Sequence, residues 1–390
     1  MSFIDFIKDQ DLEGAKYTTS EIDQQPELWL EAFQLIVANK ERIESFLQKY
    51  VFSKKARIIF TGAGTSAYVG DTASPLLRKK LTNQVESIAT TDIVSNPLNY
   101  FKQDQPTVLI SFARSGNSPE SVATYNLAKQ LVKDLSQIII TCNPEGKLAE
   151  AARKDENTLL LLMPEKSNDQ GFAMTSSFSC MYLTALTIFQ LDNLQEYKRK
   201  VIRAAENARD ILDRYYEQII QLVKLDKKKV VYLGSSTLKG LAQETSLKHL
   251  ELTSGKIPTF FESVLGFRHG PKSIVDDQTL IFVFLSNDSY TRKYELDLLK
   301  EMKSDGGAKT VVAISNFVSE EHVANSDVIL SVSADENNIL ADDLLALNYL
   351  IIGQLFALFN SIHLGVTPDN PSPSGIVNRV VKGVEIYNLD

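Results

Sequence analysis

A chain of 390 residues with 44% apolar and 23% charged side chains is typical of a globular protein of two or three domains, each able to bury a core. Its formal net charge of −8 argues against non-specific binding of nucleic acid. The N-terminus lacks the pattern of a signal peptide and no run of about 18 apolar residues predicts a membrane span, so we expect a cytoplasmic protein.

Residues 1–50 are expected to form a helical N-terminal segment. Pro26 opens a stretch in which apolar side chains from Leu28 to Ile43 recur at helical spacing. Residues 51–195 then alternate short apolar strands with longer amphipathic helices, which is typical of βαβ units and a parallel sheet. The expected strands lie near 57–61, 86–90, 107–112, 137–142 and 158–163, and the expected helices near 66–81, 118–133 and 146–154.

Residues 196–366 are expected to repeat this layout. Helical patterns at 175–191 and 198–224 close the first unit and lead into the second. The second set of strands is expected near 229–233, 257–261, 279–284, 310–315 and 328–332, before a long apolar helix at 341–363. Residues 367–390 form a tail, in which three prolines exclude a helix or central strand until a short helix around Asn378–Gly383.

Three segments of the first unit return about 172 residues later in the second. The pairs are Arg57–Gly62 with Lys229–Gly234, Thr107–Phe112 with Thr279–Phe284, and Ile138–Asn143 with Val311–Asn316. Matches in register indicate that one α/β unit was duplicated. The sequence therefore predicts two tandem units, each with a doubly wound, flavodoxin-like parallel sheet.

The two copies differ in loops suited to an anion. Ligands of doubly wound sheets bind at the carboxyl ends of strands, where small residues and helix N-termini present N–H groups. The first copy has Gly62–Ser66, Ser115–Ser118 and the hydroxyl cluster Thr175–Ser177 in such positions, whereas the second has Ser286–Ser289 in place of Ser115–Ser118. Any one loop alone is more often a helix cap, but three in one unit favour a phosphate monoester.

The chain shows no pattern for a cofactor or metal. A nicotinamide fingerprint would need glycine at position 67, which is Ala67. The four histidines include no close pair at metal-ligand spacing. Cys142 and Cys180 are far apart, so we expect buried thiols rather than a disulfide.

The loop pair Thr61–Ser66 and Ser111–Ser118 resembles the phosphosugar-binding loops of the SIS (sugar isomerase) domain family. In the second copy, Phe267–Lys272 resembles the histidine loop of that family's aminosugar-phosphate isomerases. With Phe172–Phe178, it makes the chain, from about residue 25 to 390, similar to the galactosamine-6-phosphate deaminase/isomerase branch, also called tagatose-6-phosphate ketose/aldose isomerase. The resemblance implies a phosphosugar-binding SIS domain at 51–195, a catalytic SIS domain at 196–366 and a tail over the active site at 367–390.

The resemblance also implies which residues contact the phosphate or sugar. They are Gly64, Thr65, Ser66, Arg114, Ser115, Asn117, Ser118 and Thr175. Two positions depart from the family. Ala113 stands where related isomerases often carry serine, and Arg114 stands where some carry glutamine, although Arg114 can add a bidentate donor to an anion.

Interconversion of an aldose and a ketose needs a base beside the carbonyl and a group that opens the ring, for which glutamate and histidine are natural choices. Glu244, Lys248 and Glu251 are spaced to share one helical face. Such charges are commonly a solvated, ion-paired face. Because Leu247–Glu251 resembles the segment with the enolisation base, however, the family likeness implies that Glu251 is the base and that Lys248 contacts the sugar.

The resemblance implies that His269 opens the sugar ring. Glu262 either orients His269 or is a charge at a strand end, and Lys382 either closes over the sugar or is a basic residue at a helix end. We expect His249 and His363 to be structural.

The implied reaction converts galactosamine 6-phosphate to tagatose 6-phosphate with release of ammonia, in amino-sugar catabolism. Two alternatives remain open: a hexose-6-phosphate aldose/ketose isomerase without deamination, and a non-catalytic phosphosugar-binding regulator. Neither a DNA-binding helix-turn-helix nor a glutamine amidotransferase domain is expected. The family habit implies a homodimer or higher homo-oligomer, in which His269 serves its own or the neighbouring subunit, without nucleic-acid or membrane partners.

Overall fold

The computed structural model describes residues 2–9, 14–333, 339–381 and 383–389, which form two compact units. The first-sheet unit contains Glu27–Asp169, Ser176–Lys198 and Ser374–Asp390. The second-sheet unit contains Met1–Pro26, Gln170–Thr175 and Arg199–Pro373. The chain therefore crosses between the units several times, and the helical N-terminal segment is divided between them.

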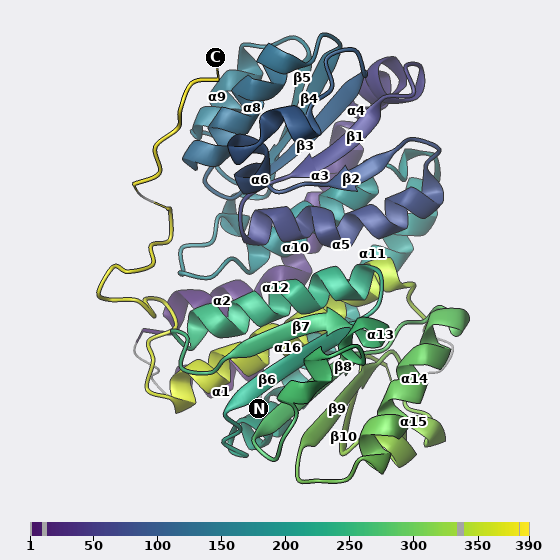
Figure 1. Cartoon of the computed structure of the whole chain (residues 1–390), viewed down its shortest axis with the longest axis vertical. Coiled ribbons are helices and arrows are strands. Elements are labelled where there is room, and N and C mark those ends of the chain that lie inside the picture. The colour runs from purple at the N-terminus through teal and green to yellow at the C-terminus, as the bar shows by residue number, and fades with distance from the viewer. Residues whose placement is uncertain (1, 10–13, 334–338, 382, 390) are drawn as a thin grey trace. The chain divides into compact units, whose positions relative to one another are not determined.

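The first-sheet unit is built on five parallel strands in the order β2-β1-β3-β4-β5 (Figure 1). The strands are β1 (Arg57–Thr61), β2 (Val85–Ser87), β3 (Thr107–Ala113), β4 (Leu135–Thr141) and β5 (Thr158–Leu162). Its α-helices are α3 (Gln25–Ala38), α4 (Lys40–Phe46), α5 (Thr65–Lys80), α6 (Thr90–Ser95), α7 (Pro97–Tyr100), α8 (Pro119–Leu131), α9 (Lys147–Arg153) and α10 (Ser176–Thr187). The shorter turns are a π-helix at Leu47–Phe52 and 3-10 helices at Glu165–Ser167 and Leu191–Asn193.

The second-sheet unit repeats this topology, with the strand order β10-β9-β8-β6-β7 (Figure 1). The strands are β6 (Lys229–Gly234), β7 (Thr259–Ser263), β8 (Thr279–Phe284), β9 (Thr310–Ser315) and β10 (Val328–Ser331). Its helices are α1 (Phe3–Asp9), α2 (Lys16–Asp23), α11 (Leu194–Val223), α12 (Thr237–Leu252), α13 (Val264–Phe267), α14 (Ser289–Ser304), α15 (Glu320–Asn325) and α16 (Asp342–His363), with a 3-10 turn at Pro271–Ile274.

Both sheets confirm the predicted doubly wound, flavodoxin-like fold. Counted from the first strand of each copy, both sheets have the order 2-1-3-4-5, whose switch point lies between the first and third strands. The register is also shared, since Thr61 pairs with Ser111 and Leu233 pairs with Val283, each 172 residues later. The duplication inferred from sequence is therefore a structural repeat.

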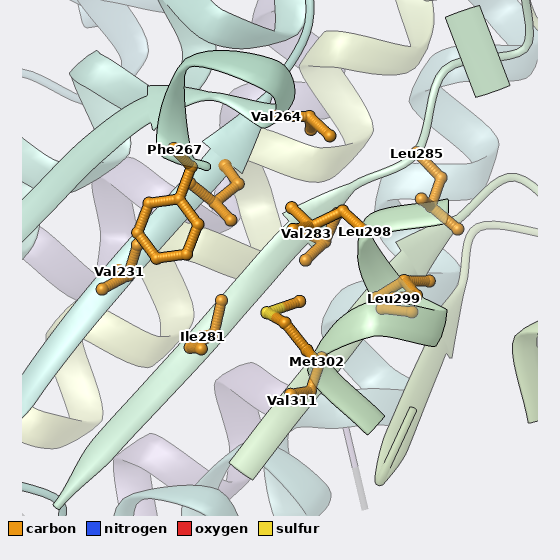
Figure 2. Close-up of a cluster of buried hydrophobic side chains, with 12 residues drawn as sticks. Val231, Val264, Phe267, Ile281, Val283, Leu285, Leu298, Leu299, Met302 and Val311 are labelled. Carbon is orange, nitrogen blue, oxygen red and sulfur yellow. The ribbon is translucent and has the colours of Figure 1, made fainter. Parts of the chain in front are cut away.

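The core of the second sheet is a closely packed layer of aliphatic side chains. Figure 2 shows Leu298, Leu299 and Met302 of α14 lying against Val283 of β8, and all four side chains are buried. On the other side, α12 contacts β6, β7 and α16. By length and composition α16 alone among the described helices could cross a membrane, but 94% of its most apolar stretch is buried within the protein.

Three local predictions need correction. β2 ends at Ser87, because Thr90 already begins α6, so the expected strand at 86–90 is displaced. β7 runs two residues later than expected, at Thr259–Ser263. The helix expected at 378–383 is wrong for the described residues, which form bends and extended chain. A segment this short cannot sustain an isolated helix, and Gly383 adopts a φ of +78°.

Candidate active site

The first anion loop leaves β1 at the switch point of the first sheet. Gly64 precedes α5 with φ of 56° and ψ of −130°, a conformation that favours glycine. A Cβ on Gly62 would collide with the backbone of Ser66. Thr65 and Ser66 are buried at the start of α5. The sequence thus allows a tight turn that directs the N-terminus of α5 toward the carboxyl edge of the sheet.

Three buried hydroxyls at this edge have no hydrogen-bond partner among the described residues. They belong to Thr61 at the end of β1, Ser111 in β3 and Thr65 at the start of α5. A buried hydroxyl without a partner costs about 1–3 kcal/mol, so a native protein keeps such groups where a ligand or water satisfies them. Only Thr65 was predicted. Thr61 and Ser111 lie inside strands, where no loop motif marks them. The one signal that could have found them is that they are paired neighbours on adjacent strands.

The second anion loop leaves β3 and is held by its own polar contacts. The Asn117 N–H donates to the Ser115 hydroxyl at 3.2 Å, and the Asn143 amide donates to the Ser115 carbonyl at 2.9 Å. The Ser118 hydroxyl donates to that of Ser121 at 2.6 Å. Gly116 has a φ of +67°. These contacts hold the loop after β3 against the loop after β4, and β3 itself is the neighbour of β1 in the sheet.

Arg114 lies between this loop and the C-terminal tail. Its guanidinium is buried and donates to the carbonyl oxygen of Arg379 at 2.8 Å. The Arg379 guanidinium in turn donates to the carbonyl oxygen of Asp169. The tail therefore contacts the predicted phosphate loop through Arg379, which carried no sequence signal. Lys382 lies outside the described residues.

The third predicted cluster is placed differently. Thr175 is fully buried and belongs to the second-sheet unit, although the sequence assigned it to the first copy. The N–H groups of Ser176 and Ser177 donate to the Asp169 carboxylate at 3.0 and 2.9 Å. Asp169 therefore caps α10, and these two N–H donors bind the chain's own carboxylate.

The charged face of α12 is buried rather than solvated. Lys248 and Glu244 have side-chain exposures of 1% and 0%, whereas Glu251 retains 24%. The Lys248 ammonium lies 2.5 Å from the Glu251 carboxylate and 3.6 Å from that of Glu244. Burial of an ammonium demands compensating charge. The helix thus holds one cation between two carboxylates and leaves only Glu251 accessible, as a proton-transfer group must be.

His249, one residue after Lys248, lies about 100° further around the helix and is structural. Its Nδ1 lies 3.0 Å from the Tyr232 hydroxyl, and its Nε2 lies 2.7 Å from the Asn360 amide. Complete burial lowers the pKa of His249 to about 3, so the ring is neutral at physiological pH. His363 is partly exposed at the end of α16, near Asp226.

The histidine loop is fixed at its flanks and open at its centre. Arg268 and Lys272 both pair with Glu301 of α14, and Lys272 also pairs with Asp305 at 2.6 Å. Between them, His269 is exposed and Gly270 has a φ of +125°. Two ion-paired residues therefore present the imidazole to solvent on a short, defined loop.

Glu262 does not orient His269 as one prediction had it. Its carboxylate lies 2.7 Å from the Lys239 ammonium and accepts a hydrogen bond from the Ser263 N–H at 2.6 Å. Partial burial acts to raise the pKa of Glu262, but the bonds from Lys239 and Ser263 outweigh it and lower the pKa. Glu262 is a strand-end charge, the alternative that the sequence left open. Across the described residues no cluster of three or more His, Cys, Asp or Glu could hold a metal ion.

Comparison with known proteins identifies the domain and its relatives. The SIS domain matches residues 51–191 and 225–360. The chain is 42% identical over 379 residues to D-galactosamine-6-phosphate deaminase AgaS of Escherichia coli, covering 95% of each chain. It is 42% identical over 377 residues to the AgaS deaminase of Shewanella sp. (strain ANA-3), covering 96% of this chain and 92% of the relative.

Among solved structures, tagatose-6-phosphate ketose/aldose isomerase from Escherichia coli matches with a TM-score of 0.88 and 39% identity. The match covers 95% of this chain and 96% of that one. The two regions that the SIS domain matches contain both sheets, the predicted phosphate loops and the predicted histidine loop. The C-terminal tail lies outside them. The chain therefore belongs to the SIS domain family, of which it carries two tandem copies.

Proposed function

We propose that this protein is a phosphosugar isomerase and deaminase that converts galactosamine 6-phosphate to tagatose 6-phosphate and ammonia in amino-sugar catabolism. The observation that carries the proposal is the charged cluster on α12. In this cluster the buried Lys248 ammonium lies between the buried Glu244 carboxylate and the partly exposed Glu251 carboxylate. A solvated ion-paired face, the competing interpretation, would leave Lys248 exposed. The names of the 42% identical relatives support the same substrate.

In the proposed mechanism the phosphate binds at the loops after β1 and β3, where Thr61, Thr65 and Ser111 have unused hydroxyls. His269 transfers the proton that opens the ring, and Glu251 removes the C2 proton of the open-chain aldehyde. The C2–H electron pair forms the C1–C2 double bond of an enolamine as the C1 carbonyl becomes a hydroxyl. Reprotonation at C1 leaves an imine at C2, and water hydrolyses this imine to the ketose and ammonia.

The remaining candidate residues have supporting roles in this proposal. Lys248, assigned to the sugar by the family resemblance, is buried and acts on the sugar through the Glu251 carboxylate beside it. Lys382 of the tail is proposed to act on the same sugar. In the first loop, Gly64 shapes the turn and Ser66 supplies a donor to the phosphate. In the second loop the donors are supplied by Arg114, Ser115, Asn117 and Ser118. Thr175 contacts the sugar.

We further propose a cytoplasmic homodimer or higher homo-oligomer. The second-sheet unit leaves large apolar side chains exposed along the edge strand β7 and the following helix, namely Phe260, Phe261 and Leu265. Exposed aromatic side chains on a sheet edge are a liability in a monomer. Cys142 and Cys180 are free and buried, and burial raises the pKa of Cys142 to about 12, as suits inert thiols in a reducing compartment.

Replacing Thr65 with valine is expected to weaken phosphosugar binding without destabilising the fold. Its hydroxyl has no partner to lose among the described residues, whereas a lost bond to a charged phosphate is worth about 1.5–3 kcal/mol, or roughly tenfold or more in affinity. Calorimetric titration with galactosamine 6-phosphate measures this change. The matched control is Thr237→Val, since Thr237 occupies the equivalent position in the second copy and is likewise buried without a partner. Equal loss in both variants would contradict the assignment.

A panel of hexosamine and hexose 6-phosphates, scored together for ammonia and ketose, tests the proposed activity itself. We expect ammonia and tagatose 6-phosphate in equal amounts from galactosamine 6-phosphate. Ketose formation only from hexose 6-phosphates would identify the simple isomerase instead. Binding without any turnover across the panel would identify a phosphosugar-binding regulator.

A further inference from the structure

The turn before α12 keeps the shape of the turn before α5, although its chemistry has changed. Ser236 adopts φ of 55° and ψ of −122°, almost the values of Gly64, which lies 172 residues earlier. Like Gly62, Gly234 approaches the helix backbone so closely that a Cβ would collide with Leu238. A serine at positive φ is strained, and such strain persists where the surrounding structure requires the conformation. The second copy has thus retained an anion-type turn.

The strand ends at this turn no longer offer hydroxyls. Thr61 and Ser111 of the first copy correspond to Leu233 and Val283, which are part of the apolar core of the second sheet. Polar donors remain at Ser235 after β6, at Thr237 at the start of α12 and at Ser286 after β8. These loops flank the switch point of the second sheet.

A carboxylate from the same unit occupies this place. Glu295 is fully buried on α14 and accepts a hydrogen bond from the Ser286 N–H at 2.7 Å. The Ser235 side chain lies beside this carboxylate, whose Oε1 has no hydrogen-bond partner among the described residues. Leu298 and Leu299 follow one turn later on the same face of α14 and lie in the apolar core in Figure 2. The Glu295 carboxylate is therefore inserted between the ends of the two strands that flank the switch point.

A second carboxylate and one guanidinium complete the cluster. Asp342, at the start of α16, accepts bonds from the Ser286 hydroxyl at 2.5 Å and from the Asn287 N–H at 2.7 Å. Arg292 donates through Nε to the Ser286 carbonyl oxygen at 2.6 Å and also to the Asn287 side chain. Two backbone N–H groups and the Ser286 hydroxyl thus donate to carboxylate oxygens, as donors of these kinds do where proteins bind oxyanions, and Arg292 holds the loop that carries them.

We propose that the second copy retains an oxyanion-binding site and that Glu295 fills it as an internal substitute for phosphate. Glu295 thereby restricts phosphosugar binding to one site per chain. Desolvation by burial raises the pKa of Glu295 to about 7, while Ser286 and Ser235 act to lower it. That the first copy binds phosphate rests on the proposed function. That Glu295 lies at the equivalent place in the second copy does not.

Replacing Glu295 with alanine should open the site to inorganic phosphate. We expect calorimetry to find one more phosphate per chain for Glu295→Ala than for the wild type. The control Asp297→Ala removes an exposed carboxylate from the same helix and should leave the stoichiometry unchanged. An unchanged stoichiometry in Glu295→Ala would overturn the proposal.

A double variant separates this inference from the proposed function. Thr65→Val combined with Glu295→Ala should keep the added phosphate site even where the first site is weakened. If Thr65→Val alone has no effect, the first-copy assignment fails while the added site can still be counted.

Thermal unfolding tests the inference if Glu295→Ala is too unstable for calorimetry. Phosphate should raise the Tm of Glu295→Ala and of the shorter polar variant Glu295→Ser more than that of the wild type, against chloride at matched ionic strength. An equal rise in all three proteins would refute the opened site.

Discussion

Glu251→Gln is expected to lower the rate of C2 proton exchange with solvent by about 10²–10⁴-fold, the usual contribution of a positioned base. Glutamine keeps the size of the side chain and its place beside Lys248 but cannot accept the proton. Binding of galactosamine 6-phosphate should change little, since the phosphate-binding loops belong to the other copy. Proton exchange is measured by NMR in D₂O, and affinity by calorimetry.

Glu320→Gln is the control for the loss of a carboxylate in the same unit, because Glu320 is exposed in the first turn of α15. It should retain wild-type exchange. Near wild-type exchange in Glu251→Gln would exclude Glu251 as the base, and loss of binding with intact exchange would reverse the assigned roles of the two copies.

Lys248→Met is expected to lower the free energy of unfolding by about 3–5 kcal/mol, the range for removing one partner of a buried ion pair. Methionine fills much of the space, but the buried Glu244 and the nearby Glu251 would then face each other without a cation. Urea unfolding, followed by circular dichroism, measures the difference from the wild type.

Lys239→Met provides a matched comparison on the same helix. Lys239 pairs with Glu262 at 2.7 Å, but the two side chains are 43% and 29% exposed. Exposed pairs contribute at most about 1 kcal/mol, so this variant should lose far less stability. Similar losses in both variants would mean that Lys248 is not the electrostatic centre of a buried cluster.

The sheet topology could be predicted because it is set by local patterns that occur twice. Alternation of apolar strands and helices indicated parallel sheets, and the shared offset of 172 residues indicated the same order in each. The strands β2 and β7 were misplaced because both lie at a sheet edge, where burial is incomplete and the apolar pattern is weak.

The predicted site was incomplete for a different reason. Glu251 and Lys248 were identified by spacing and resemblance, but the full burial of Lys248 results from tertiary packing around α12, which spacing along the helix does not show. The contact of Arg379 with Arg114 likewise joins segments that are far apart in the chain. Local spacing carries no information about such contacts.

Thr61 and Ser111 were missed because a hydroxyl inside a strand is usually satisfied by its surroundings. In the structure both hydroxyls are buried and have no hydrogen-bond partner among the described residues. The apolar residues Leu233 and Val283 take their places in the second copy.

One experiment tests directly whether the copies have divided binding from chemistry. C2 proton exchange is followed by NMR across a titration of galactosamine 6-phosphate for the wild type, Thr65→Val and Glu251→Gln. If the copies divide binding from chemistry, Thr65→Val needs more substrate for saturation but reaches nearly the wild-type maximum rate of exchange. Glu251→Gln saturates at the same substrate concentration as the wild type, but its maximum rate of exchange is lowered by about 10²-fold or more. A lowered maximum in Thr65→Val, or a wild-type maximum in Glu251→Gln, would contradict it.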